Sequence, residues 1–330
     1  MRCHQGIKMR FDLSLYTKYR AELMGIAAML IIICHAYANG VEMSIPMQKI
    51  LCMGGHGVDM FLFLSGMGLT CSLENVKSKG NLLDWYKRRY IRILIPYLLF
   101  AIPFYAIIVL LEKQTVLDYF LKVSTLSYWI NGWGLWYVAM LIPLYLLTPI
   151  IVRLVTGNNG IVWLGVLILF SALFAMVPVQ EKSALRNVQF CIERLPSFCL
   201  GIYMWRAIRE AKKISLWVVL VIPIVVYAVL YVLNHTLCTH FSLFWLLSLP
   251  LLTISSLLLK RGCGLRLISG FMGDISLESY CTNVIIPSLF IRIFHLQMSL
   301  CWYCLIVVIC ILLSVVVNRI AKRILKLRLQ

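Results

Sequence analysis

Long apolar runs separated by short polar gaps constrain this chain more than any other feature of its sequence. A helix needs about twenty apolar residues to cross a bilayer, because each residue adds only about 1.5 Å to its length. Pro196 and Pro287 interrupt the sixth and ninth runs, and membrane helices tolerate such breaks where they line a cavity. We therefore expect an all-α, polytopic transmembrane helix bundle of about ten spans. The expected spans are residues 21–40, 51–72, 93–111, 133–153, 160–178, 190–206, 215–233, 241–259, 268–291 and 299–318.

The composition supports a membrane protein and excludes a nucleic-acid-binding one. Hydrophobic residues make up 62% of the chain and charged residues 13%, whereas a soluble domain is about half apolar and about a quarter charged. The net charge of +18 comes from Lys and Arg that gather at the ends of apolar runs rather than along a polar face. We interpret the twelve cysteines as packing residues and expect no metal site.

The distribution of Lys and Arg predicts the orientation of the chain. If the amino terminus is cytoplasmic, most of the 31 Lys and Arg residues fall in segments on that same side, as the positive-inside rule requires. We therefore expect both termini in the cytoplasm and a multi-pass protein of the cytoplasmic membrane, in contact with its lipids. Without internal repeats or linkers, residues 1–330 are expected to form one domain with no appended soluble domain. Residues 1–20 are expected as a cytoplasmic N-terminal segment, and residues 319–330 as a basic cytoplasmic tail.

His35 is the first candidate for chemistry, because an imidazole inside a membrane span is costly. It follows Arg20 by fifteen residues, roughly 22 Å along a helix, which places it in the outer third of the membrane. At about 100° per residue the two side chains differ by about 60° and share a helix face. The alternative is that a backbone carbonyl near the outer interface satisfies His35.

Asp59 is the second candidate. It lies in the second expected span, which also contains His56 and crosses the membrane back toward the cytoplasm. Counted from the outer surface, Asp59 lies level with His35 in the adjoining antiparallel helix. A carboxylate beside an imidazole fixes its tautomer and raises its basicity, the usual arrangement of a general base. Asp59 could instead cap a helix or form a structural ion pair, and an interfacial His56 needs no further explanation.

Lys87, Arg88, Arg89 and Arg92 form a basic cluster where the third span begins. Arg88 and Arg92 are four residues apart on one helix face, where two guanidinium groups could bind phosphates from the cytosol. Basic residues at inner span ends also set topology and bind anionic lipids. Composition alone leaves both interpretations open.

Other charged residues lie within or beside two later spans. Glu278 is expected near the middle of the ninth span, where an uncompensated carboxylate favours a role in a polar cavity. Glu193 and Arg194 stand where the sixth span enters from outside, and they could pair with each other.

Several sequence blocks together resemble the acyltransferase-3 family of integral membrane O-acyltransferases. Four blocks match in order, and the second and third are specific in combination. The family is a bundle of about ten spans, in agreement with the number expected from the apolar runs. The blocks are ELMGIAAMLIIICHAY, GVDMFLFLSGMGL, YKRRYIRILIPYLL and GLWYVAMLIPLYLLTPII, followed by the weaker RLPSFCLGIYM and GDISLESY.

The resemblance implies transfer of an acyl group, commonly acetyl, from cytoplasmic acyl-CoA to a hydroxyl on a carbohydrate or lipid-linked glycan. Acyl-CoA is then a donor substrate, and no permanently bound cofactor is expected. His35 stands at the position of the family's catalytic histidine and would act as general base. Arg88, Arg89 and Arg92 match the basic motif implicated in donor binding.

One position departs from the family pattern. Many members carry an arginine eleven positions before the histidine, where this chain has Met24. Arg20, one turn further inward on nearly the same face, could supply that guanidinium and stabilise the oxyanion.

Two other functions stay open. A proton-coupled transporter or flippase of a glycan or lipid-linked sugar would suit about ten spans and membrane carboxylates at Asp59 and Glu278, although no inverted repeat is visible. A non-catalytic relative that serves as a membrane scaffold would suit Met24, and it would bind CoA without turnover.

Overall fold

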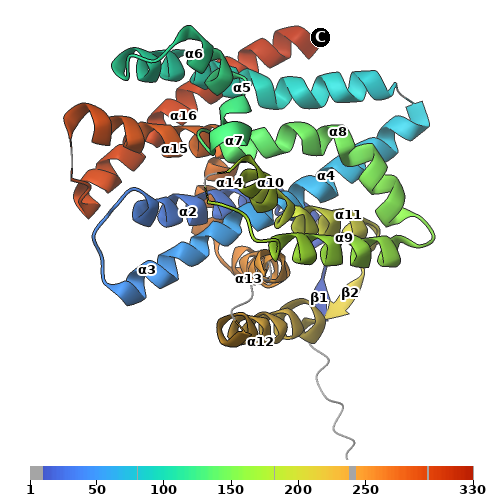
Figure 1. Cartoon of the computed structure of the whole chain (residues 1–330). Helices are drawn as coiled ribbons and strands as arrows, with labels where there is room; N and C mark the ends of the chain where they lie inside the picture. The colour runs from blue at the N-terminus through green and yellow to red at the C-terminus, as the bar shows by residue number, and fades with distance from the viewer. Residues whose placement is uncertain (1–9, 80, 182, 238–242, 296, 330) are drawn as a thin grey trace, which may run out of the picture.

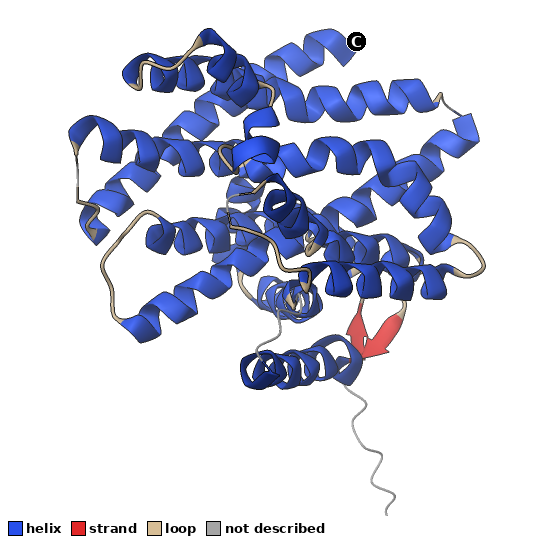
Figure 2. Cartoon of the chain, viewed as in Figure 1, coloured by secondary structure: helices blue, strands red, loops and turns tan. Residues whose placement is uncertain are grey.

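The chain folds almost entirely into helices (Figure 1). The computed structural model describes residues 10–79, 81–181, 183–237, 243–295 and 297–329. Within these residues, Figure 2 shows strand only in the short antiparallel pair β1–β2. The elements are β1 (Arg10–Asp12), α1 (Leu15–Lys18), α2 (Arg20–Ala38), α3 (Ile45–Cys52), the 3-10 turn η1 (Met53–His56), α4 (Gly57–Lys79), α5 (Leu82–Leu111), α6 (Val116–Val123), α7 (Leu126–Asn131), α8 (Trp136–Thr156), α9 (Gly160–Ala175), α10 (Ala184–Ile192), α11 (Leu195–Arg209), β2 (Lys213–Ser215), the π-helical turn η2 (Trp217–Val221), α12 (Ile222–Leu237), the 3-10 turn η3 (Phe244–Leu247), α13 (Ser248–Arg261), α14 (Cys263–Asp274), α15 (Ser276–Phe294) and α16 (Leu300–Leu329).

Among the described residues, seven helices are long and apolar enough to cross a membrane. The protein is therefore an all-α polytopic bundle, as expected. The number of about ten spans and the cytoplasmic termini stay predictions. α9 is apolar but shorter than the seven, and the expected ninth span is divided between α14 and α15. The seven helices are Arg20–Ala38, Ile45–Val76, Leu82–Leu111, Trp136–Thr156, Trp217–Thr236, Phe244–Arg261 and Leu300–Leu327.

Several long helices run across the bundle and end at its right or left edge in Figure 1, whereas α12 and α13 lie below them. α5 begins at Leu82 and α8 ends at Thr156 on the right of the figure, an edge that we call the basic end. α2 ends at Ala38 and α16 begins at Leu300 on the left, an edge that we call the histidine end. Residues 319–329, expected as a separate basic tail, continue α16 instead.

α2 occupies the centre of the bundle, where it packs against α4, α14 and α15. Burial differs sharply between inner and peripheral spans. Of the apolar window in Ile45–Val76, 72% is buried, against 6% of that in Trp217–Thr236. Apolar side chains on such a peripheral helix can only be accommodated by lipid, so α12 lies at the margin of the bundle.

The ten cysteines of the described residues are free thiols. Of the six cysteines within apolar runs, five are buried or partly buried: Cys34, Cys71, Cys199, Cys281 and Cys310. Cys301 and Cys304, spaced as C-x-x-C in the first turns of α16, are exposed. The interpretation of cysteines as packing residues therefore fits the covered positions and not the exposed ones, which also include Cys52 and Cys263.

Two glycines allow α4 and α11 to cross in close contact. A Cβ atom on Gly66 would overlap the carbonyl oxygen of Phe198, and one on Gly201 would overlap the carbonyl oxygen of Phe63. Membrane helices use small residues at such crossings because the backbones can then approach closely. This crossing fixes α11 against the first turns of α4, where Asp59 lies.

We expect Gly201→Ala to destabilise the protein by about 1–3 kcal/mol, because the added methyl group forces α4 and α11 apart. Gly165→Ala in α9 is a matched control, since a Cβ atom there meets nothing within 4 Å. Thermal unfolding in detergent, followed by intrinsic fluorescence, measures both variants. Equal melting temperatures for the two variants would contradict the close crossing.

Candidate functional site

His35 lies in the last turn of α2, at the histidine end, with its imidazole half-buried. Its Nδ1 is 2.9 Å from Nδ2 of Asn283 in α15. The hydroxyl of Tyr303 in α16 donates to the carbonyl oxygen of Ile32 at 2.6 Å and lies 3.5 Å from Oδ1 of Asn283. Three helices thus meet at the imidazole, and its polar neighbour is a side-chain amide rather than the backbone carbonyl considered from the sequence.

Sequence reasoning missed both Asn283 and Tyr303. Asn283 closes a polar stretch, SLESYCTN at 276–283, whose residues from Glu278 onward are all buried in α15. A buried amide within an apolar span is costly, so this stretch was a usable signal. Tyr303 carried no comparable signal, because tyrosines near span ends are common.

Asp59 does not lie level with His35 as expected. A Cβ atom on Gly57 would meet the carbonyl oxygen of Ala27, and one on Gly54 that of Leu30, which places Asp59 beside the middle of α2. Its carboxylate is turned to α11. Nη1 of Arg194 donates to Oδ2 at 2.7 Å, and the hydroxyl of Ser197 donates to Oδ1 at 2.8 Å. Nδ1 of His56 is 3.8 Å from Oδ2. The expected pairing of Asp59 with His35 is therefore wrong, because α4 packs against both α2 and α11 and the arginine stands on α11's side.

Aromatic rings enclose the arginine of this ion pair. The Arg194 guanidinium lies 4.3 Å from the ring centre of Phe244, 5.1 Å from that of Phe190 and 5.4 Å from that of Trp136. Glu193 bonds Arg186 at 3.1 Å and Arg194 bonds Asp59, so each of the two residues that could have paired with each other has another charged partner. A fully enclosed ion pair that spans two helices fits the structural interpretation of Asp59 that the sequence left open.

Arg20 begins α2 at the opposite end of the same helix from His35. Its Nη2 donates to the carbonyl oxygen of Leu64 at 3.4 Å, and its buried Nε has no hydrogen-bond partner among the described residues. Arg20 is close enough to Arg89 for their charges to interact. A continuous helix holds it roughly 22 Å from His35, so the expectation that it stabilises an oxyanion beside His35 is wrong.

A cavity of about 430 Å³ lies between α4 and α5 at the basic end. Three guanidinium groups of the basic cluster line it, together with several polar side chains and one carboxylate. Lys87 is exposed and is not part of the lining. The lining residues are Ser72, Asn75, Val76, Asn81, Asp84, Trp85, Arg88, Arg89 and Arg92.

Glu278 is buried in the first turn of α15, where it faces α16 rather than His35. Nδ2 of Asn318 donates to Oε1 of Glu278 and to the carbonyl oxygen of Asp274, both at 2.9 Å. Nζ of Lys322 lies 3.6 Å from the Asp274 carboxylate. The carboxylate expected to be uncompensated therefore has a hydrogen-bond donor, and it joins α15 to α16.

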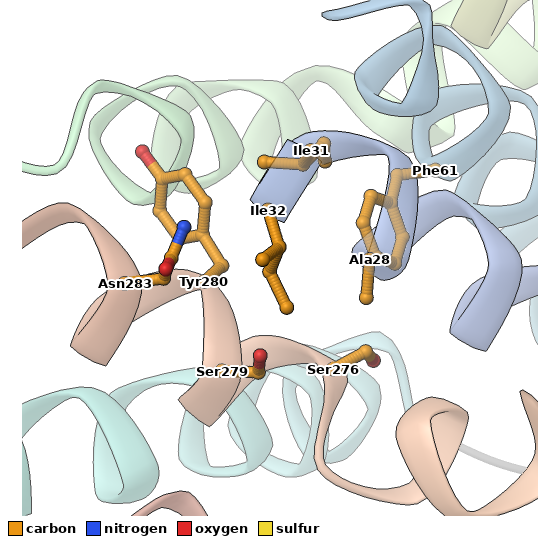
Figure 3. Close-up of a pocket in the computed structure, with 8 residues that line it drawn as sticks. All are labelled: Ala28, Ile31, Ile32, Phe61, Ser276, Ser279, Tyr280 and Asn283. Carbon is orange, nitrogen blue, oxygen red and sulfur yellow. The ribbon is translucent and has the colours of Figure 1, made fainter. Parts of the chain in front are cut away.

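A narrow gap between α2, α4 and α15 adjoins Asn283 (Figure 3). It is too tight to admit a water molecule. The hydroxyl of Ser279 points toward it and has no hydrogen-bond partner within the described part of the chain. Along α2 the gap extends from Ala28 to Ile32, between Arg20 and His35.

The site thus has two parts at opposite ends of one bundle. At the histidine end, an imidazole with Nδ1 engaged can exchange a proton through Nε2. At the basic end, three arginines can bind an anion by forked, charge-assisted hydrogen bonds. The described residues contain no group of His, Cys, Asp and Glu able to hold a metal ion.

Comparison with known proteins yields one family match. A family model described as an acyltransferase domain matches residues 23–319, nearly the whole chain. No curated protein and no solved structure matches the chain.

Proposed function

The chain belongs to the acyltransferase-3 family of membrane acyltransferases, and on that premise we propose that it transfers an acetyl group from cytoplasmic acetyl-CoA to a hydroxyl of a cell-surface carbohydrate or lipid-linked glycan. The observation that carries the proposal is that the candidate site has two separate parts, one at each end of the bundle. A half-buried imidazole lies at one end of the bundle and an arginine-lined cavity at the other.

The donor would bind at the basic end. Coenzyme A carries phosphate groups that Arg88, Arg89 and Arg92 can grip with paired N–H groups. The cavity volume lies in the usual range for small-molecule sites, about 300–1,000 Å³. Arg20 adds a further positive charge close to Arg89. Basic residues placed only to set topology would not need to line a cavity.

The thioester would reach His35 along the gap between α2 and α15. The gap lies on the line from Arg20 to His35, and Ser279 offers a hydroxyl to the amide groups of the pantetheine arm. Because the gap is closed to water, α2 and α15 must separate as the arm enters. Exclusion of water protects the thioester from hydrolysis.

His35 would act as general base at the histidine end. Nε2 takes the proton of the acceptor hydroxyl while the oxygen attacks the thioester carbonyl carbon. The tetrahedral intermediate then collapses, its C–S bond breaks, and the imidazolium returns the proton to the departing sulfur. The products are an O-acetyl ester and free coenzyme A.

Sealed membrane vesicles provide the test of this function. Inside-out vesicles that contain the protein are incubated with [14C]acetyl-CoA, and label is counted in the glycan and lipid fractions. We expect incorporation that requires the protein and that is absent from right-side-out vesicles, where the donor faces the wrong side. A transporter or flippase would leave both fractions unlabelled, and so would a scaffold that binds coenzyme A without turnover.

Arg92→Ala is expected to raise the KM for acetyl-CoA about tenfold with little change in kcat, because it removes a charge-assisted hydrogen bond worth about 1.5 kcal/mol. Lys87→Ala is the matched control on the same helix, since Lys87 is also exposed but lies outside the cavity lining. We expect it to change KM less than about threefold. Initial rates over a range of donor concentrations measure both variants, and equal KM values would place the donor elsewhere.

A further inference from the structure

The distances between the side chains around His35 favour one arrangement of hydrogens. Tyr303 lies 2.6 Å from the carbonyl oxygen of Ile32, which can only accept, so the single hydroxyl hydrogen of Tyr303 is donated there. The Tyr303 oxygen also lies 3.5 Å from one end of the Asn283 carboxamide. With its hydrogen already used, Tyr303 can take part in this second contact only as an acceptor.

The carboxamide of Asn283 occupies the same volume after a half-turn, which exchanges Oδ1 and Nδ2 between Tyr303 and His35. With Oδ1 toward Tyr303, two acceptors would compete for one hydroxyl hydrogen. With Nδ2 toward Tyr303, each contact has one donor and one acceptor. The second orientation directs Oδ1 of Asn283 at Nδ1 of His35, which lies at hydrogen-bond distance, 2.9 Å.

We propose that Asn283, oriented by Tyr303, is a positioning residue that holds His35 in the tautomer with hydrogen on Nδ1 and a free lone pair on Nε2. Nδ1 donates to Oδ1 of Asn283, while Nε2 has no hydrogen-bond partner among the described residues. Nε2 is then the atom that removes the proton of the acceptor hydroxyl. This assignment of roles rests on the proposed function, but the tautomer itself does not.

Burial stabilises the hydrogen bonds that join Tyr303, Asn283 and His35. Asn283 is 1% exposed and Tyr303 is 4% exposed, so water does not compete for their polar groups. A neutral amide also suits this place better than a carboxylate. It orients the ring through a partial charge, without burying a full negative charge in the membrane.

The tautomer of His35 and the rate of acetyl transfer are tested by separate experiments. Solid-state 15N NMR of the histidine-labelled protein in liposomes, with His35→Gln to assign the signal, reads which ring nitrogen carries hydrogen. We expect a protonated Nδ1 and an unprotonated Nε2 for His35 in the wild type. A protonated Nε2 would overturn the inference whether or not the protein is an acetyltransferase.

Asn283→Leu removes the acceptor with little change of shape, and we expect kcat to fall about 100-fold with KM for acetyl-CoA nearly unchanged. Asn283→Asp restores an acceptor, so it should keep kcat within about tenfold of the wild type. If Asn283 donated to Nδ1 instead, the aspartate variant would be as inactive as the leucine variant.

Thr282→Val is the structural control from the same turn of α15, because Thr282 bonds Ser314 and contacts neither His35 nor Asn283's partners. We expect its kcat to stay within about threefold of the wild type, since a buried hydroxyl pair contributes to stability rather than to the reaction. Equal losses in Thr282→Val and Asn283→Leu would assign Asn283 a packing role only. Absence of transfer by the wild type would reject the proposed function and leave the NMR result to decide the tautomer.

Discussion

Replacing His35 by alanine is expected to lower acetyl transfer by about a thousandfold, because the acceptor hydroxyl loses the general base that we propose for it. The imidazole stands where three helices meet, and its Nδ1 contacts the neutral amide of Asn283 rather than a carboxylate that could serve as a second base. Incorporation of [14C]acetyl by inside-out vesicles, normalised to the amount of protein, measures the loss.

Two variants make the result specific. His35→Gln keeps a side chain that can bond Asn283 but cannot act as a base, and it should be as inactive as His35→Ala. His235→Ala removes an exposed imidazole from α12 and should leave transfer unchanged. Transfer by normally folded His35→Ala at the wild-type rate would remove the general base from the mechanism.

Asp59→Ala is expected to be the most damaging substitution for stability among those considered, at about 3–5 kcal/mol. The change leaves the Arg194 guanidinium without its counter-ion, and that side chain is only 6% exposed. Three aromatic rings hold the guanidinium in place, so it cannot turn out to water. The yield of monodisperse protein and its melting temperature in detergent measure the effect.

A double variant separates a structural role of the pair from a chemical one. Asp59→Leu with Arg194→Met replaces both charges by apolar groups, a change that often restores stability in buried pairs. We expect the double variant to fold better than Asp59→Ala and to retain transfer activity. A double variant that folds normally but is inactive would show that Asp59 or Arg194 takes part in the reaction.

The sequence predicted which charged residues lie inside the bundle, such as Asp59 and Glu278, better than it predicted their neighbours. His35 and Asp59 both lie in helices where spans were expected, but Asp59 lies beside the middle of α2 rather than level with His35. Which neighbour a side chain faces depends on how several helices pack, and one sequence does not contain that information. Asp59 therefore turned out to face Arg194, a residue 135 positions away.

The arginines show the same contrast between what spacing in the sequence predicts and which neighbours a side chain has. The spacing of Arg88 and Arg92 predicted a shared face, and both line the cavity. Arg20 was assigned to His35 because the two share a face of α2, although their separation along the helix already excluded contact. Asn283 was not predicted because an ionisable group gives a stronger signal in an apolar span than a neutral amide, and it is the amide that contacts the imidazole.

The ion pair between Asp59 and Arg194 has a consequence for the assembly of the protein during its synthesis. A ribosome adds about 5–20 residues per second, so Asp59 emerges on the order of 10 s before the partner that lies 135 residues later. During that interval the carboxylate lacks its counter-ion, and α4 is a poor candidate for stable insertion on its own. α4 can therefore reach its final position only after α11 has been synthesised. The order in which segments leave the insertion machinery is thus part of how this bundle reaches its native arrangement.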